Sequence, residues 1–123
     1  MPWLRRPPRV VERAEGAPPA VALTFDDGPS RWTAAIAASF ERHGCHATFF
    51  LRGPEIERHP ETVAALTAAG HELGNHLWTH SDASTQTPSE IRAELRRTSA
   101  AVTVRWITSW ARPSSRDPPL SLY

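Results

Sequence analysis

Three short strand-like segments alternate with stretches of helical periodicity, and this alternation constrains the fold more than any other feature of the chain. The strand-like segments cover residues 20–25, 46–51 and 71–74. The first, Ala-Val-Ala-Leu-Thr-Phe, is a nearly continuous apolar run, typical of a strand that is covered on both faces. Strands that alternate with helices indicate an α/β fold with a parallel sheet.

Helices are predicted in the intervals between these strands. Ser30 can cap a helix in which Trp32, Ile36 and Phe40 recur four apart as an apolar stripe, and Gly44 can end it. This pattern places Trp32 and Phe40 in the core. Two further helices are predicted over residues 60–70 and from the Thr-Pro-Ser-Glu capping box at 87–90 to about residue 102.

The chain divides into three parts by composition. Residues 1–19 are rich in proline and arginine and are predicted to be a flexible leader. Residues 20–103 carry the alternating pattern, and residues 104–123 are predicted to be an irregular, divergent tail. The leader lacks the apolar core of a signal peptide, so a cytoplasmic location is expected for the chain as given. No stretch approaches the roughly 18 apolar residues of a membrane-spanning helix.

Charge and cysteine content bear on the kinds of site that the chain can form. Fourteen basic and thirteen acidic residues give a net charge of +1. This balance gives no excess of basic charge of the kind that binds nucleic acid. Cys45 is the only cysteine of the 123 residues. An internal disulfide and a cysteine-based zinc site are therefore excluded.

Two polar clusters follow the predicted strands. Asp26 and Asp27 follow the first strand, and His76 and His80 follow the third. In α/β folds, ligands bind at the carboxyl ends of the strands. Two imidazoles four residues apart share one face of a helical turn and can reach one ion of zinc or a similar metal. Taken alone, two such aspartates more often belong to a plain turn, and two such histidines to a solvated surface.

Together these clusters are far more specific. Thr-Phe-Asp-Asp-Gly at residues 24–28 resembles the first motif of the NodB-homology polysaccharide deacetylases, a carbohydrate esterase family. Gly-His-Glu-Leu-Gly-Asn-His at 70–76, with His80, resembles the second motif, and residues 47–51 are similar to the second strand of the family. The resemblance extends from about residue 21 to about residue 101.

The resemblance implies a fold, a reaction and roles for particular residues. The expected fold is part of a distorted (β/α) barrel, and the expected reaction removes N-acetyl groups from an N-acetylated polysaccharide or oligosaccharide such as chitin or peptidoglycan. Asp27, His76 and His80 would hold one divalent ion, with zinc expected and cobalt or another transition metal as alternatives. Asp26 would act as general base. Family members commonly act outside the cytoplasm or at the cell surface.

The sequence also departs from the family pattern. The third motif, Arg-x-Pro followed by an aromatic residue and glycine, is matched only by Arg-Pro-Ser-Ser at residues 112–115. Arg112 either orients Asp26 or is a solvated loop arginine. The substrate-facing tryptophan and the general-acid histidine of the later motifs have no counterpart, so weak or no activity is expected, as from a truncated or frame-shifted product. The alternative is a non-catalytic remnant that binds a metal or a sugar polymer weakly.

The same pattern predicts weak points in the fold. Three strand–helix units cannot close a barrel, so the sheet is expected to keep exposed edges that pair non-specifically with other copies of the chain.

Overall fold

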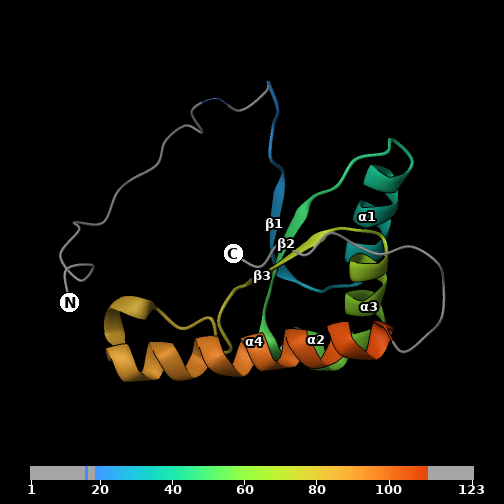
Figure 1. Cartoon of the computed structure of the whole chain (residues 1–123). Coiled ribbons are helices and arrows are strands. Elements are labelled where there is room, and N and C mark those ends of the chain that lie inside the picture. The colour runs from blue at the N-terminus through green and yellow to red at the C-terminus, as the bar shows by residue number, and fades with distance from the viewer. Residues whose placement is uncertain (1–15, 17–18, 111–123) are drawn as a thin grey trace.

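Three parallel strands form the centre of the molecule. The computed structural model describes residue 16 and residues 19–110, with side chains up to residue 103. The sheet has the order β1-β2-β3, in which β1 spans Thr24–Gly28, β2 spans Thr48–Leu51 and β3 spans Glu72–Asn75. The expected parallel α/β arrangement is therefore confirmed. Within the described residues this sheet does not close on itself, as in part of an α/β barrel (Figure 1).

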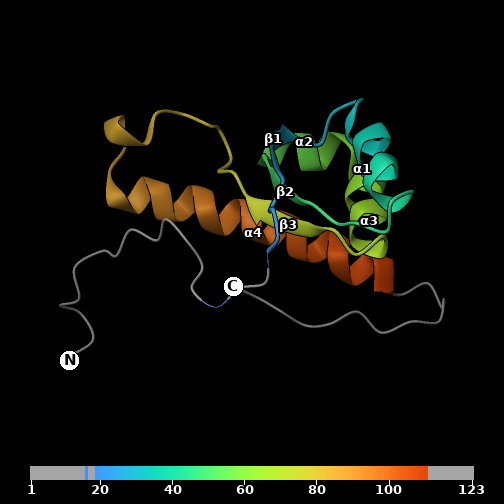
Figure 2. The ribbon, with the colours of Figure 1, turned by 90° about the horizontal axis from the view of Figure 1, so that it is seen from above.

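Helices lie beside the sheet and along one of its ends. The two helices α1 and α3 lie side by side, and α4 runs past the sheet and packs against α2, α3 and β3 (Figures 1 and 2). Among the described residues no helix combines the length and the apolar character needed to cross a bilayer. The helices are α1 (Thr33–Glu41), α2 (Gly53–Arg58), α3 (Pro60–Ala68), the 3₁₀ turn η2 (Ala83–Thr85) and α4 (Pro88–Trp110).

Several element boundaries differ from the sequence predictions, and the structure contains one helix that was not predicted. The first strand begins at Thr24 instead of residue 20 and continues through the two aspartates, because pairing with β2 starts at Thr48. The short helix α2 was not predicted, since six residues are too few to show a helical period. Helix α4 continues to Trp110, so the irregular structure expected from residue 104 is wrong for residues 104–110. Residues 111–123, including Arg112, lie outside the described part.

The core lies between β2 and the helices that cover it. The ring of Phe49 stacks on that of Phe25 at a centroid distance of 5.3 Å, and Phe25 also meets the edge of Phe40 at 5.8 Å. Phe40 thus packs against the core as predicted, although it remains partly exposed. The fully buried apolar side chains include Phe49, Leu51, Ile56, Val63 and Leu66.

Trp32, in contrast, does not belong to the core. Its side chain is 61% exposed. The helix begins one residue later, and Thr33 takes the inward position, where its Oγ1 accepts a hydrogen bond from Ser30 N at 2.9 Å. Trp32 precedes the first helical turn, so counting it in the apolar stripe was wrong. The guanidinium of Arg31 lies over its indole, 4.6 Å from the ring centroid.

A buried histidine joins β2 and β3 beneath α1. His71 Nδ1 accepts a hydrogen bond from Ala47 N at 3.1 Å, so the proton of the neutral ring sits on Nε2. That Nε2 is buried without a hydrogen-bond partner among the described residues, and the nearest carboxylate oxygen, Glu41 Oε1, is 3.9 Å away. The ring also meets the edge of Phe49. A neutral imidazole fits this site, whereas an imidazolium would lose the acceptor for Ala47.

The stability of the fold is expected to fall in mild acid because of His71. Burial lowers its pKa below the ordinary 6.5, Glu41 opposes this shift, and His46 adds to it. In the folded state the neutral ring is favoured, so the unfolded chain binds more protons as the pH drops through 6.5. The stability contribution is therefore complete above this pH and is lost below it.

Urea unfolding at several pH values between neutral and mildly acidic checks this expectation. His71→Gln, which cannot titrate, should flatten the pH dependence, whereas His43→Gln at an exposed site should preserve it. An NMR titration of the His71 ring provides the same answer without a variant. The expectation would be contradicted if the free energy of unfolding of His71→Gln kept the same dependence on pH and the ring pKa lay at or above 6.5.

We also expect the edges of the sheet to cause self-association. In the described part of the chain β1 and β3 are both edge strands. Leu23, immediately before β1, is 50% exposed. The unpaired backbone groups of an open edge can form hydrogen bonds with a strand of another chain. Light scattering during gel filtration should show a mass that rises with concentration, and Leu23→Lys should reduce it more than Leu95→Lys on α4. A monomer at every concentration would show that these edges are protected.

Candidate metal centre

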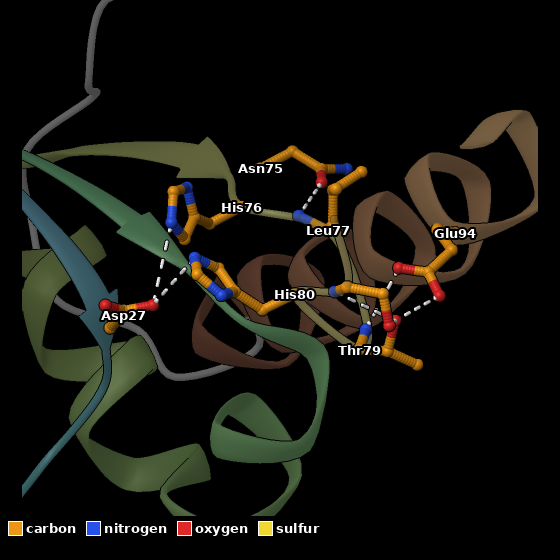
Figure 3. A network of polar contacts seen from close by, with 8 residues as sticks. Asp27, Asn75, His76, Leu77, Thr79, His80 and Glu94 are labelled. Atoms are coloured by element: carbon orange, nitrogen blue, oxygen red, sulfur yellow. Dashed lines mark hydrogen bonds and ion pairs between the residues drawn. The ribbon is translucent and has the colours of Figure 1, made fainter. Parts of the chain in front are cut away.

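Three side chains from two separate parts of the sequence meet at the carboxyl edge of the sheet. Asp27 Oδ1 lies 3.6 Å from His76 Nε2 and 3.4 Å from His80 Nε2. One potential ligand atom of each residue lies within 4.8 Å of the others. Figure 3 shows the carboxylate facing both imidazoles. The structure thus brings together the three residues for which the sequence predicted a metal-binding role.

An irregularity in β1 presents the Asp27 carboxylate to the histidines. Phe25 pairs with Phe49 and Gly28 with Leu51, so β1 advances three residues while β2 advances two. The extra residue forms a bulge, and Asp27 has a φ of 67°, in the left-handed region. Bulges bend a strand and redirect a side chain, and they are common beside active sites. The left-handed conformation costs roughly 1–2 kcal/mol for a residue with a Cβ.

The two histidines meet through a bent loop, not through the helical turn that their spacing suggested. Leu77 has a φ of 62° and His80 a φ of 58°. Asn75 Oδ1 accepts a hydrogen bond from Leu77 N at 3.0 Å, and His76 N donates to Leu51 O at 3.0 Å. The imidazole centroids are consequently only 4.7 Å apart. The expected proximity is found, but its geometric cause is different.

Helix α4 holds this loop through the Glu94 carboxylate. Oε2 accepts hydrogen bonds from Trp78 N at 3.1 Å and Thr79 N at 3.0 Å, and Oε1 accepts one from Thr79 Oγ1 at 2.6 Å (Figure 3). These bonds, with that of the Thr79 side chain first, hold the pKa of Glu94 below its ordinary value. Sequence reasoning missed Glu94, since nothing in its helical position signals a contact with a preceding loop.

Tight packing around Trp78 adds to this anchorage. A Cβ at Gly53 would lie only 1.9 Å from the indole, so α2 can approach the loop only with glycine there. Gly53 N also donates to Leu77 O at 3.2 Å. On the α4 side, the Arg97 guanidinium lies 3.6 Å from the centroid of the Trp78 ring. The loop is therefore clamped between α2 and α4.

The remaining predicted site residues lie outside the cluster of three. Asp26 is exposed on β1, next to Asp27, and is not one of the residues whose ligand atoms converge. Its place beside the cluster is compatible with a proton-transfer role, which stays a prediction. Arg112 falls in the part of the chain that is not described, so its suggested contact with Asp26 also stays a prediction.

The chemistry of the three converging donors fits a divalent transition metal. Two imidazoles and one carboxylate form a recognised catalytic zinc set, which leaves positions for water and substrate. The three side chains are partly exposed, with relative accessibilities of 57% for Asp27, 26% for His76 and 48% for His80. A ligand could therefore reach an ion held at this point without displacing the core.

Comparisons with known proteins agree with this arrangement. The family model described as polysaccharide deacetylase matches residues 13–116. A chitooligosaccharide deacetylase from Bradyrhizobium sp. (strain ANU 289) is 38% identical over 84 residues, which cover 68% of this chain and 38% of the relative. The chain thus spans well under half the length of this relative.

Solved structures show the same similarity. The peptidoglycan deacetylase PdaC from Bacillus subtilis superposes with a TM-score of 0.67 at 34% identity, over 69% of this chain and 43% of the other. A family 4 carbohydrate esterase from Streptomyces lividans, in complex with acetate, gives a TM-score of 0.66 at 33% identity, over 69% and 44%. Because the family model covers most of the sequence and these folds agree, the chain belongs to the polysaccharide deacetylase family.

Proposed function

We propose that this chain is a metal-dependent hydrolase that removes N-acetyl groups from an N-acetylated polysaccharide. The observation that carries the proposal is the convergence of Asp27, His76 and His80 at the carboxyl edge of the sheet, with donor atoms within 4.8 Å of one another. The names of similar proteins, a chitooligosaccharide deacetylase and a peptidoglycan deacetylase, support this substrate class. The bond broken is an amide carbon–nitrogen bond outside a peptide chain.

The three converging residues would hold one divalent ion, with zinc expected and cobalt or another transition metal as alternatives. When bound, such an ion supplies Lewis acidity and lowers the pKa of water to about 7. The Asp26 carboxylate, exposed beside Asp27, takes a proton from the attacking water as general base. The amide bond then breaks, acetate forms, and the sugar nitrogen departs as an amine.

The departing nitrogen must also gain a proton, and this step limits the proposed activity. In the family that the chain resembles, a histidine of a later motif supplies this proton, and we propose no such role for the histidines of residues 20–103. Absence of a general acid costs about 10²–10⁴-fold in rate. At 1.36 kcal/mol per decade, this corresponds to roughly 3–5 kcal/mol of barrier. We therefore propose that the 123-residue chain turns over slowly.

Acetate release from N-acetylglucosamine oligomers and from peptidoglycan tests the proposal. The chain should release a trace of acetate, lose this activity after treatment with a chelator, and regain it with zinc. Acetate release that is indifferent to the chelator would contradict a metal-dependent reaction. Metal binding with no acetate from either substrate would support the alternative, a non-catalytic remnant that binds metal.

A further inference from the structure

The two histidines of the candidate metal centre are not carried by a rigid element. His76 follows the last residue of β3, and His80 lies at the end of a loop in which two residues have left-handed backbone conformations. Such conformations persist only where the surroundings determine them. The placement of His80 relative to His76 therefore depends on what holds the loop between them.

The imidazoles have no second anchor of their own in the described part of the chain. Metal-binding histidines usually donate their other ring N–H to a carboxylate or carbonyl, which orients the ring. Within residues 19–103, Nε2 of His76 and of His80 faces Asp27, and neither Nδ1 has a hydrogen-bond partner. The rings are oriented instead through the backbone that carries them.

The part of that backbone directly before His80 is bound by a carboxylate from α4. Glu94 accepts all three hydrogen bonds from Trp78 N, Thr79 N and Thr79 Oγ1. Thr79 is the residue directly before His80, and two of the three bonds come from it. Without Glu94, two adjacent backbone N–H groups directly before His80 would lose their acceptor, while the contacts of Asn75 and Gly53 hold only the earlier part of the loop.

We infer that Glu94 is a positioning residue for the metal centre, which acts through Thr79 to hold His80 at the distance from His76 and Asp27 that one ion requires. The inference rests on the proposed metal site. It assigns to Glu94 an effect on metal affinity and coordination geometry beyond any effect on the stability of α4. Loss of an outer partner of this kind typically weakens metal binding by 10–100-fold.

Glu90 on the same helix provides a matched control. Its Oε2 accepts hydrogen bonds from Thr87 N at 2.7 Å and Thr87 Oγ1 at 2.7 Å, so it caps the first turn of α4. Glu90→Gln removes the same charge from the same helix and weakens comparable bonds, but its partners lie outside the loop of the two histidines. It separates a loss of helix stability from a loss of metal positioning.

Titration of the full chain with Co²⁺ and Zn²⁺, in competition with a chromophoric chelator, tests the inference. Glu94→Ala should weaken binding of both ions by about 10–100-fold and should change the visible absorption spectrum of the cobalt form. Glu94→Gln retains the shape and one acceptor oxygen, so it should recover part of the affinity. Thr79→Val should give a smaller loss, and Glu90→Gln none, at a temperature where circular dichroism shows every variant folded.

Three outcomes would overturn the inference. Wild-type affinity and spectrum in Glu94→Ala, with binding abolished by Asp27→Ala, would leave the metal site standing and remove the role of Glu94. An equal loss of metal affinity in Glu90→Gln would show that the effect comes from the stability of α4. Absence of binding by the wild-type chain would overturn the proposed metal site and the inference together.

Discussion

Replacing Asp27 with alanine is expected to weaken zinc binding by more than about 100-fold, beyond the 10–100-fold typical of an outer partner. Asp27 is the only carboxylate in the converging group, and its Oδ1 faces both imidazoles. Its removal leaves two neutral donors and no anionic ligand. Isothermal titration of the purified chain with zinc measures the effect, with Glu57→Ala, an exposed carboxylate on α2, as the control.

Zinc binding should depend on the two histidines as well. His76→Ala and His80→Ala each remove one nitrogen donor, and each should lower the zinc content of the purified chain sharply. His43→Ala removes an exposed imidazole whose Nδ1 contacts Ser39 O at 2.8 Å and should leave the zinc content unchanged. Equal zinc content in all four proteins would show that these residues do not form the site.

Replacing Asp26 with asparagine should lower acetate release by about 10²–10⁴-fold, the usual contribution of a positioned general base. Asparagine keeps the shape of the side chain but cannot accept the proton of the attacking water. Because Asp26 is not one of the three converging ligands, zinc affinity should be retained. The measurement compares acetate release and zinc binding on the same preparations. Acetate release that is unaffected by the substitution would exclude Asp26 as the base.

Asp27→Asn serves as the comparison for Asp26→Asn. It should lower both zinc affinity and acetate release, because a neutral amide replaces the anionic ligand. Substitutions of the two adjacent aspartates are therefore expected to have different effects. The change at Asp26 should lower acetate release alone, and the change at Asp27 should lower both zinc affinity and acetate release. A loss of zinc affinity in Asp26→Asn equal to that in Asp27→Asn would contradict this division of roles.

The edge of the sheet at which the site residues lie could be predicted because the parallel direction of the strands follows from local patterns. The alternation of strands and helices implied a parallel sheet, and parallel strands place their carboxyl ends at one edge. This rule places the pair Asp26 and Asp27, at the end of β1, near His76, directly after β3, and the family resemblance implied that Asp27 is the ligand. His80 follows because it is only four residues further along the chain.

The details that bring the donor atoms together could not be predicted. The bulge in β1 depends on the register between Phe25 and Gly28, and residue spacing in one strand contains no information about its partner. The loop that contains the left-handed residues Leu77 and His80 also depends on acceptors elsewhere in the fold. Glu94 is such an acceptor, and its contact with the loop joins residues far apart in sequence.

The exposure of one side chain was also predicted wrongly, because it depends on the residue at which a helix begins. Trp32 fits an apolar stripe with Ile36 and Phe40 if the helix includes it, but the helix begins at Thr33. One residue of difference places an indole in solvent instead of in the core. The extension of α4 to Trp110 was missed for a related reason, because Val104 to Trp110 shows no clear apolar period.

Anomalous diffraction at the zinc absorption edge, from crystals of the full chain grown with zinc, tests the proposed metal centre most directly. We expect one strong peak between Asp27, His76 and His80, with zinc–nitrogen distances of about 2.0–2.1 Å and a zinc–oxygen distance of about 2.0–2.2 Å. No peak at these residues, or a peak bound only by other side chains such as those of His43 and His46, would contradict the assignment of this site.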